Sequence, residues 1–356
     1  MQATTSLKGN LPREGMRNLG VHRPMCDIDG MKQMNLDESG FERETKRTRK
    51  HEFLDEMNLV VPWVQLVSLI APHGPAHGTK GGRPPFAVEN MLRIHFLQQW
   101  FNLSDPALGA LLYDMALPRK FVGLDAGGDN LPDESTILRF RHLLETHNLN
   151  LQILATVTAT LAANGLLLNS GTAIDAALIA ATSSTKNSSD ERGPKMHCTK
   201  KGNQCHFGTK AHIGVDADSG LVHTVAGRAA SVNDVMQAHA LVHGEETNVL
   251  ADTGYQDVDK REETQGINHW HVATQPDKRK GLEKSTTRGA ILDQLEPVKA
   301  RLQAKVEHPL RLIKNQFRHV KVLYQGLKKN TAQLHTLFPL SNLWMVGMTL
   351  RQEMRG

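Results

Sequence analysis

The chain has 356 residues, of which 39% are hydrophobic and 22% charged, so it has the length and composition of a globular protein with two or three domains. Its net charge is +5 and its pI is near 9.0, and the basic excess gathers in short segments, as is typical of proteins that bind a polyanion. Three cysteines exclude a disulfide framework and no apolar run is long enough to span a bilayer, so we expect a cytoplasmic protein without a membrane segment.

The first 50 residues are rich in glycine and charge and lack hydrophobic periodicity. We expect residues 1–50 to form a disordered extension and basic arm. Further along, a loop rich in proline and glycine contains Gly82-Arg83-Pro84, which is similar to an arm that places Arg83 in a narrow minor groove of DNA. A simple linker is the alternative interpretation of this loop.

Helical periodicity begins near His51, and helices are expected over residues 51–70 and 87–101. Ser104-Asp105-Pro106 then offers a capping side chain followed by proline, which predicts a helix from there to about Met115.

A further helix is expected after a capping residue at Asp133 or Ser135, with Arg139 and Arg141 on its outward face. We interpret residues 51–165 as an all-α DNA-binding domain that reads DNA in the manner of a helix-turn-helix, in which both arginines contact DNA. Plain solvent exposure is the alternative for these two side chains.

Short apolar strands and helices alternate after Asn169-Ser170-Gly171, which predicts an α/β layered domain over residues 166–345 and a tail over residues 346–356. The expected elements are strands over 172–179, 249–251 and 269–273, a hairpin over 207–225, a helix over 234–243 and long helices from about 289.

Three acids in this domain are notable for their placement. Asp175 is the one charge in an apolar strand, Asp252 ends a buried strand, and Glu307 is the single acid between Lys299 and Asn330, among nine basic residues. A buried carboxylate needs a cation or hydrogen-bond donors. Because Mg²⁺ prefers oxygen ligands, these acids are candidate ligands of divalent metal at a phosphodiester.

The basic residues after Glu307 have the spacing of one helix face. On this face the Arg and Lys side chains would bind phosphates while Glu307 binds metal. Because proline cannot donate a helical hydrogen bond, Pro309 predicts a helix start or bend at residues 307–309. The face is expected to carry Glu307, Arg311, Lys314 and Arg318.

Several motifs in this order resemble the DDE transposases of bacterial insertion sequences, and among them the insertion sequence five group. They are G82-R-P-P85, M91-L-R-I-H-F-L-Q-Q-W100, L131-P-D-E-S-T-I-L-R-F-R-H-L-L144, S183-S-T-K-N187, H206-F-G-T-K-A-H-I-G-V-D216, V249-L-A-D-T-G-Y255, V306-E-H-P-L-R-L-I-K314 and N342-L-W344. The resemblance covers the chain from Met31 onward, which suggests the hypothesis that translation starts at Met31.

The resemblance implies an RNase H-like catalytic domain, a mixed sheet flanked by helices. In this fold the first acid lies on the first strand, the second after the fourth strand and the third on a late helix, which correspond to Asp175, Asp252 and Glu307. It also implies two Mg²⁺ ions, with Mn²⁺ as a substitute, and double-stranded DNA as the partner: the inverted repeats of the element and a target duplex. A homodimer or larger assembly on DNA is implied as well.

The family pattern around the third acid is only partly present. Glu307 and Lys314 keep its spacing, so Lys314 is expected to assist at the site, but the positions of the family's tyrosine and arginine are Ala300 and Gln303. The resemblance as a whole predicts a transposase that cleaves and joins DNA at the terminal inverted repeats. The alternative is a catalytically impaired copy that binds DNA and represses its element.

The basic stretch from Arg192 to His212 carries five Lys or Arg and no acid. We expect Lys200, Lys201 and Lys210 to lie along a DNA backbone. Zinc bound by the histidines and cysteines of residues 197–206 is a weaker alternative, because the six-residue gap between the cysteines is poor for a zinc ribbon.

Overall fold

The computed structural model describes residues 47–75, 84–125, 129–167, 171–181, 197–201, 204–244, 246–264, 269–281 and 286–355. Residues 48–355 belong to one compact unit. The expected extension over residues 1–50, the Met31 start, Arg83 and the S183–N187 motif lie wholly or almost wholly outside the described residues. The tail expected after residue 345 is instead the end of a long helix.

The first part of this unit is all α-helical, in agreement with the sequence. Its helices are α1 (Arg49–Val60), α2 (Trp63–Ile70), α3 (Val88–Phe101), α4 (Asp105–Asp114), α5 (Ala116–Val122), α6 (Glu134–Thr146) and α7 (Leu149–Ala163). The expected helix over 51–70 is broken at Pro62, which lies between α1 and α2.

Two of the predicted helix starts are confirmed. The Ser104 hydroxyl accepts a hydrogen bond from the Ala107 amide at 3.3 Å, and Pro106 lies in the first turn of α4. The Asp133 carboxylate accepts from the Thr136 amide at 2.8 Å and caps α6. Both side chains satisfy amides that the first helical turn leaves without a partner.

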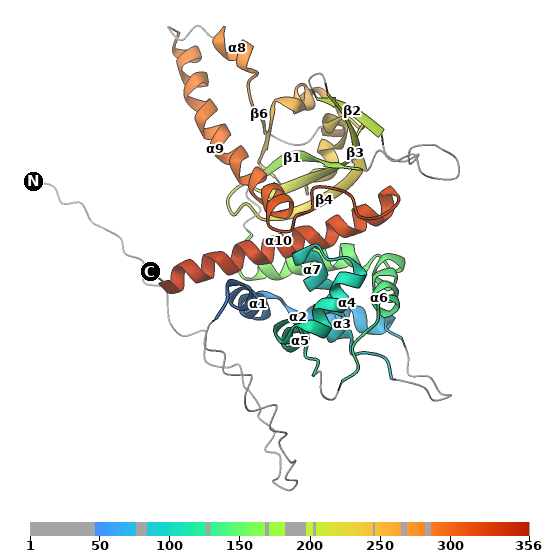
Figure 1. Cartoon of the computed structure of the whole chain (residues 1–356). Coiled ribbons are helices and arrows are strands. Elements are labelled where there is room, and N and C mark those ends of the chain that lie inside the picture. The colour runs from blue at the N-terminus through green and yellow to red at the C-terminus, as the bar shows by residue number, and fades with distance from the viewer. Residues whose placement is uncertain are drawn as a thin grey trace, which may run out of the picture. The chain divides into compact units, whose positions relative to one another are not determined.

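The second part is built on a mixed sheet in the order β4-β3-β1-β5-β6, with β2 beside the start of β3 (Figure 1). The strands are β1 (Gly171–Ala180), β2 (His197–Lys201), β3 (Gln204–Asp216), β4 (Val222–Ala229), β5 (Asn248–Ala251) and β6 (His269–Val272). β3 runs antiparallel to both of its neighbours, β1 and β4, whereas β5 and β6 run parallel to β1. This confirms the α/β class and the mixed sheet.

Side chains of β1 alternate between two cores, as expected for a strand buried on both faces. Ala173 and Ala177 pack in a core with residues of the two long C-terminal helices, whereas Ile174 packs with Ala238 and Tyr255 on the opposite face. That opposite face is covered by short 3-10 helices, of which η2 (Asp234–Leu241) replaces the α-helix expected over 234–243.

The two long C-terminal helices are α9 (Thr287–Asn315) and α10 (Leu327–Arg355), and the short α8 (Pro276–Lys280) precedes them. α9 packs on β1, β3 and β5, which places its second half over the centre of the sheet. Pro309 lies inside α9, so no helix starts at residues 307–309, and the bend that was the other expectation stays a prediction. The helix ends before Arg318, whose positive φ of 55° places it outside the helix and off the face predicted for it.

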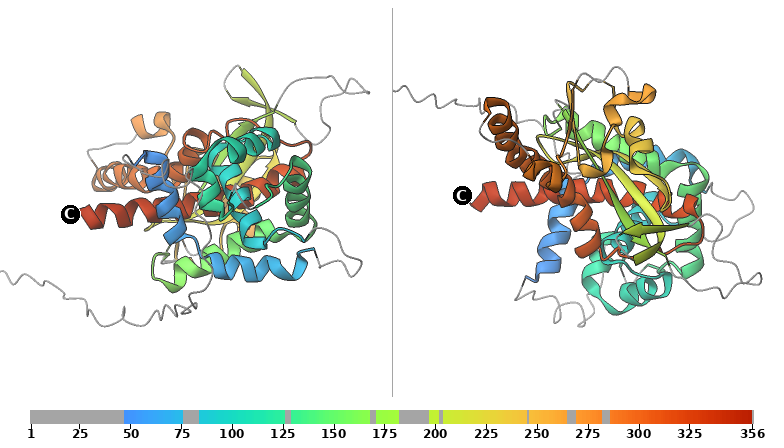
Figure 2. Two further views of the ribbon diagram at one scale, coloured as in Figure 1. Left: turned by 60° about the horizontal axis from the view of Figure 1, so that its bottom comes forward. Right: turned by 90° about the horizontal axis from the view of Figure 1, so that it is seen from above.

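α10 lies between the sheet and the N-terminal helices and contacts both (Figures 1 and 2). On the sheet side, the Asn342 amide bonds both backbone groups of Val222, at 2.9 Å and 2.7 Å. On the helical side, Gln333 donates to Gln99 at 3.0 Å in a buried contact. α10 therefore belongs to the cores of both parts of the chain.

Among the described residues, no single helix is long and apolar enough to cross a membrane. One sharply bent pair, Arg49–Val60 with Trp63–His73, passes that test by length and composition alone.

Arg141 does not face outward as the sequence analysis predicted. It is 9% exposed and donates two hydrogen bonds to Asp105, at 2.8 Å and 2.9 Å. Its guanidinium also lies over the ring of Tyr324, 4.8 Å from the centroid. Arg141 thus ties α6 to α4 and to the segment before α10, and it is not available for DNA.

The first prediction concerns this buried pair. Because Arg141→Ala leaves the Asp105 carboxylate partly buried without its partner, we expect the free energy of unfolding to fall by about 2–4 kcal/mol at pH 7, measured by urea unfolding. The loss should shrink below about pH 4, because the pKa of Asp105 is lowered mainly by its hydrogen bonds to Arg141 and the pair is lost on protonation.

The matched control for this experiment is Arg139→Ala in the same helix. Arg139 is exposed, so the change should stay within about 0.5 kcal/mol. Equal effects of the two substitutions would contradict a structural role for Arg141.

Candidate active site

The first two candidate acids lie side by side because of strand register. In the parallel pairing of β1 with β5, Ile174 is opposite Ala251, so the next residues, Asp175 within β1 and Asp252 directly after β5, lie at the same level. Neighbouring strands are about 5 Å apart, and the two side chains are neighbours at this edge. Leaving β2 aside, Asp175 is on the first strand and Asp252 directly follows the fourth.

Asp175 is partly buried and carries a strongly perturbed carboxyl group. Burial, together with the charges of Asp252, Glu307 and Asp234, raises the pKa of Asp175 to about 7. Its carboxylate accepts a hydrogen bond from the amide of Ala176 at 2.6 Å. The carboxylate is therefore held among like charges.

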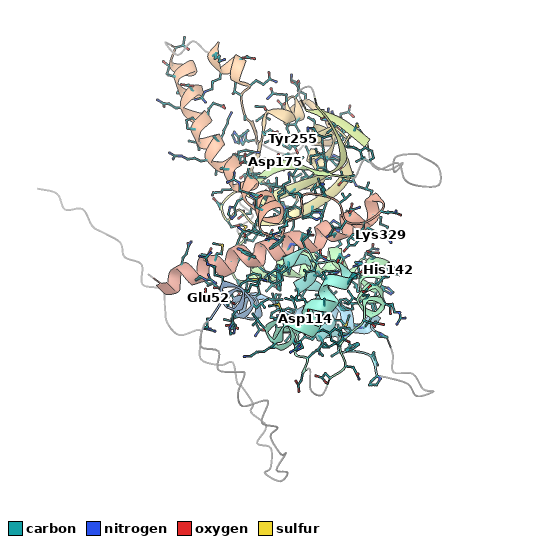
Figure 3. All side chains as sticks on the ribbon, viewed as in Figure 1. Glu52, Asp114, His142, Asp175, Tyr255 and Lys329 are labelled. Carbon is teal, nitrogen blue, oxygen red and sulfur yellow. The ribbon has the colours of Figure 1, made fainter. Side chains whose placement is uncertain are left out.

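Asp252 is fixed by the turn that follows β5. Its carboxylate caps the 3-10 helix η3 (Thr253–Tyr255) by accepting from the Gly254 amide at 2.9 Å. The ring of Tyr255 then turns back under the sheet and is 1% exposed (Figure 3 labels it beside Asp175). Burial and the charges of Asp234, Asp175 and Asp252 raise the pKa of the Tyr255 hydroxyl, which keeps it neutral.

Glu307 comes from α9, which packs on β1. One turn before it, the Gln303 amide donates to the carbonyl of Ile174 at 3.4 Å, next to Asp175. Glu307 is 56% exposed and pairs with Arg311 at 3.4 Å. α9 thus brings Glu307 near enough to raise the pKa of Asp175, while the carboxylate itself is turned toward Arg311.

Asp234 is a fourth acid of this neighbourhood, and the sequence analysis missed it. It lies at the start of η2, accepts from Lys210 at 2.9 Å and lies 3.7 Å from the buried ring of His212. The sequence signal was Asn233, which caps η2 and places Asp234 in its first turn.

Lys210 is consequently not where the sequence analysis placed it. Its side chain is 15% exposed, and its ammonium also donates to the carbonyl of Val232 at 3.1 Å. The prediction that Lys210 lies along a DNA backbone is wrong, because the ion pair with Asp234 holds it behind the acids.

The other side chains predicted to contact DNA differ in their exposure to solvent. Arg139, Arg311 and Arg318 are exposed, and Lys314 is partly buried. Lys200 and Lys201 belong to β2, but their side chains are outside the described residues, as is Arg83. Cys198 in β2 is disulfide-bonded, which leaves its sulfur unavailable to the zinc site considered for residues 197–206.

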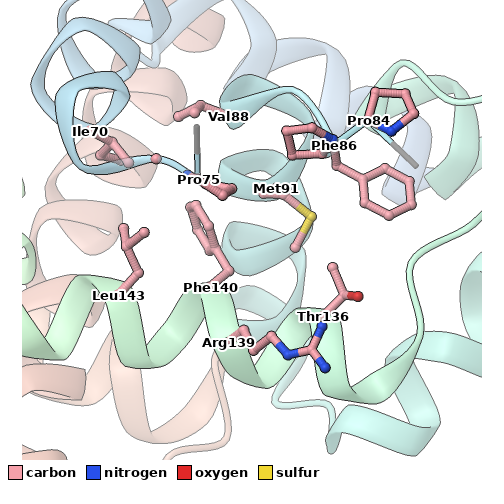
Figure 4. A pocket seen from close by; sticks show the side chains of 12 residues that line it. Ile70, Pro75, Pro84, Phe86, Val88, Met91, Thr136, Arg139, Phe140 and Leu143 are labelled. Atoms are coloured by element: carbon pink, nitrogen blue, oxygen red, sulfur yellow. The ribbon is translucent and has the colours of Figure 1, made fainter. Parts of the chain in front are cut away.

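Arg139 borders a cavity of about 410 Å³ between α6, α3 and the segment before α3 (Figure 4). The other side chains that line it are almost all apolar, among them Phe86, Met91 and Phe140. Among the described residues that line it there is no acid, so this cavity does not offer the chemistry of the acidic cluster.

The donor set at the sheet edge fits a divalent cation. It supplies carboxylate oxygens, the ligands that Mg²⁺ prefers, and the charges that act most strongly on Asp175 are all negative. Within the described residues, however, no three histidine, cysteine or acidic side chains converge closely enough to hold an ion. Asp175 and Asp252 are neighbours, and Glu307 would have to leave Arg311 to join them.

The sequence matches two known protein families. Residues 41–143 match "Transposase domain (DUF772)" and residues 167–343 match "Transposase DDE domain". This chain belongs to the DDE transposases. The second match includes the whole sheet, α9 and most of α10. No solved structure matches the chain. As a DDE transposase it is a DNA-cleaving and strand-transferring enzyme, and its family generally uses divalent metal ions.

The second prediction uses the raised pKa of Asp175. An acid whose pKa is higher in the folded state destabilises that state as pH rises from about 4 to 7. We therefore expect Asp175→Asn to raise the free energy of unfolding at pH 8 in EDTA, by at most about 4 kcal/mol, and to have little effect at pH 4.

Thermal unfolding at both pH values measures this difference. The control is Asp277→Asn, whose carboxylate is 98% exposed and should show no such gain. An Asp175→Asn variant that is less stable than the parent protein at pH 8 would show that the carboxylate is well compensated without metal.

Proposed function

We propose that Asp175, Asp252 and Glu307 are the catalytic acids of this transposase and that they hold two Mg²⁺ ions, for which Mn²⁺ can substitute. The observation that carries the proposal is the β1–β5 register, which sets the first two acids side by side with a perturbed pKa at Asp175. Divalent ions bound there would activate an attacking oxygen and neutralise charge at the phosphate.

The protein's own residues supply position rather than covalent chemistry. The pairing of β1 with β5 fixes the level of Asp175 and Asp252, and the turn after β5 orients the second carboxylate through the Gly254 amide. α9 presents Glu307 from the opposite side. Release of Glu307 from Arg311 would free the acid for the site and the guanidinium for a DNA phosphate.

We propose that Lys314 and Arg318 extend this contact, along with Arg139, Lys200, Lys201 and Arg83 elsewhere. Contacts of this kind are sequence-independent and sensitive to salt. The substrate is double-stranded DNA: the terminal inverted repeats of an insertion sequence of the insertion sequence five group, and a target duplex. Because two ends must be joined, the active form is a homodimer or larger assembly, and it acts in the bacterial cytoplasm.

The third prediction tests the site. A duplex that bears the element's end should be nicked in Mg²⁺ and stay intact in EDTA. Asp252→Asn should lower the nicking rate by at least about a hundred-fold, the scale of losing one electrostatic stabiliser, because an amide is a poor ligand for Mg²⁺. DNA binding, measured by fluorescence anisotropy, should not weaken. Unchanged nicking by this variant would remove Asp252 from the mechanism.

The fourth prediction concerns Gln303, which stands where the family has arginine. Since its amide donates to the Ile174 carbonyl beside Asp175, Gln303→Leu should slow nicking by roughly three- to ten-fold, the equivalent of one hydrogen bond, with unchanged DNA affinity. Gln294→Leu makes the same change at an exposed position of the same helix and should leave the rate unaltered. Equal rates for the two variants would mean that the contact does not position β1.

A further inference from the structure

A second groove lies away from the acids, where the helical part meets the sheet. It has a volume of about 520 Å³ and is formed by the end of α6, the start of α7, β4 and the first turns of α10. Figure 3 labels Lys329 at this end of α10, with His142 of α6 nearby. The groove is therefore lined by both parts of the chain.

The groove carries an excess of basic side chains. Arg228, Lys328 and Lys329 line it and are exposed, whereas Glu145 is its one acid. Arg228 donates to the Gln237 side chain at 2.7 Å and lies 3.4 Å from the Gly227 carbonyl. Within the part of the chain that the structure describes, none of these three bases forms an ion pair with an acid. The charge that faces the groove is thus largely unbalanced.

The position of the two lysines makes this imbalance unfavourable. They occupy the first turn of the 29-residue helix α10, where the helix dipole is positive and acids are preferred. No acid lies in that turn. The Asn330 side chain does not relieve it, because it bonds the backbone of Tyr324 and Gly326 instead. A bound anion would remove the conflict.

A buried polar side chain also points to a ligand. Asn150 is 5% exposed and lines the groove, and its side-chain oxygen has no hydrogen-bond partner among the residues that the structure describes. An unsatisfied buried polar group costs free energy comparable to a lost hydrogen bond. Since the oxygen and nitrogen of an amide can exchange places, Asn150 can offer its donor to a phosphate oxygen or accept from a bridging water.

The close approach of β4 to α10 holds the groove's basic walls together. A Cβ at Gly227 would lie 2.3 Å from the Thr331 hydroxyl, so only glycine lets strand and helix meet here. This contact fixes Arg228 of β4 relative to the lysines of α10. The bases are therefore presented on two rigid elements, as positioning of a phosphate requires.

We infer that this groove binds the phosphate backbone of the DNA duplex, through Arg228, Lys328 and Lys329. The inference rests on the proposed function as a DNA enzyme and adds a contact separate from the acids. α6 and α10 belong to different family matches, so a DNA strand bound in this groove would contact both parts of the transposase. It would fix the register of the duplex between the DNA-binding helices and the catalytic sheet.

The test is the salt dependence of binding. Affinity of the full chain for a fluorescent duplex of arbitrary sequence is measured by anisotropy over a range of KCl concentrations. Affinity falls as salt rises, and each lost phosphate contact reduces the steepness of log affinity against log salt by about 0.9. The double variant Lys328→Ala/Lys329→Ala should therefore reduce the steepness by roughly 2. Lys328→Arg/Lys329→Arg should keep the slope of the parent protein.

A matched control removes the same charge elsewhere. Lys260→Ala/Lys280→Ala takes away two exposed lysines outside the groove and should leave the slope almost unchanged. An unchanged slope in the groove variant, or an equal drop in the control, would overturn the inference while leaving nicking at the acids intact. No salt-dependent binding of any duplex by the parent protein would instead overturn the proposed function.

A small phosphate ion offers the same anionic oxygens as the DNA backbone and is the alternative ligand of this groove. Isothermal titration calorimetry with pyrophosphate, in the absence of DNA, distinguishes the two ligands. Weak binding by the parent protein, together with the slope change, supports a DNA site. Tight binding of pyrophosphate that the groove variant loses, with no slope change, would show a site for small phosphates and overturn the assignment to DNA.

Discussion

The site depends on the parallel pairing of β1 with β5. That register sets two carboxylates, Asp175 in the middle of β1 and Asp252 directly after β5, at one level, where their charges repel and burial disfavours ionisation. The sheet cannot separate the two acids without losing its ladder of hydrogen bonds. Protonation of Asp175, whose pKa is raised to about 7, relieves the repulsion, and a bound cation would relieve it with both acids ionised.

The surroundings of this pair are built from polar contacts that reach across the chain. Gln303 ties α9 to the middle of β1, Lys210 balances the charge of Asp234, and Asn342 binds α10 to Val222. Each of these links holds an element of the α/β part in place, and none lies on the open edge where Asp175 and Asp252 meet. The framework around the acids is therefore held by contacts that do not use the carboxylates of Asp175 and Asp252.

Sequence alone predicted those features that depend on local signals. The caps Ser104 and Asp133, the alternation of β1 and the order of the acids can all be identified from neighbouring residues. It failed where the partner lies far along the chain. Arg141 pairs with Asp105, 36 residues earlier, and Lys210 with Asp234, 24 residues later. Helical periodicity therefore placed Arg141 on an outward face, and the basic composition around Lys210 placed it along DNA. The break of the basic face before Arg318 depends on where α9 ends.

α10 has a consequence for shortened copies of this gene. Because this helix supplies packing to α7, α3 and α1 as well as to β4, its loss would uncover apolar surface on the helical half too. A protein ending before Leu327 would therefore not leave a self-sufficient DNA-binding fragment behind. Any naturally shortened product that still competes for the element's ends would have to obtain an equivalent helix from an intact copy.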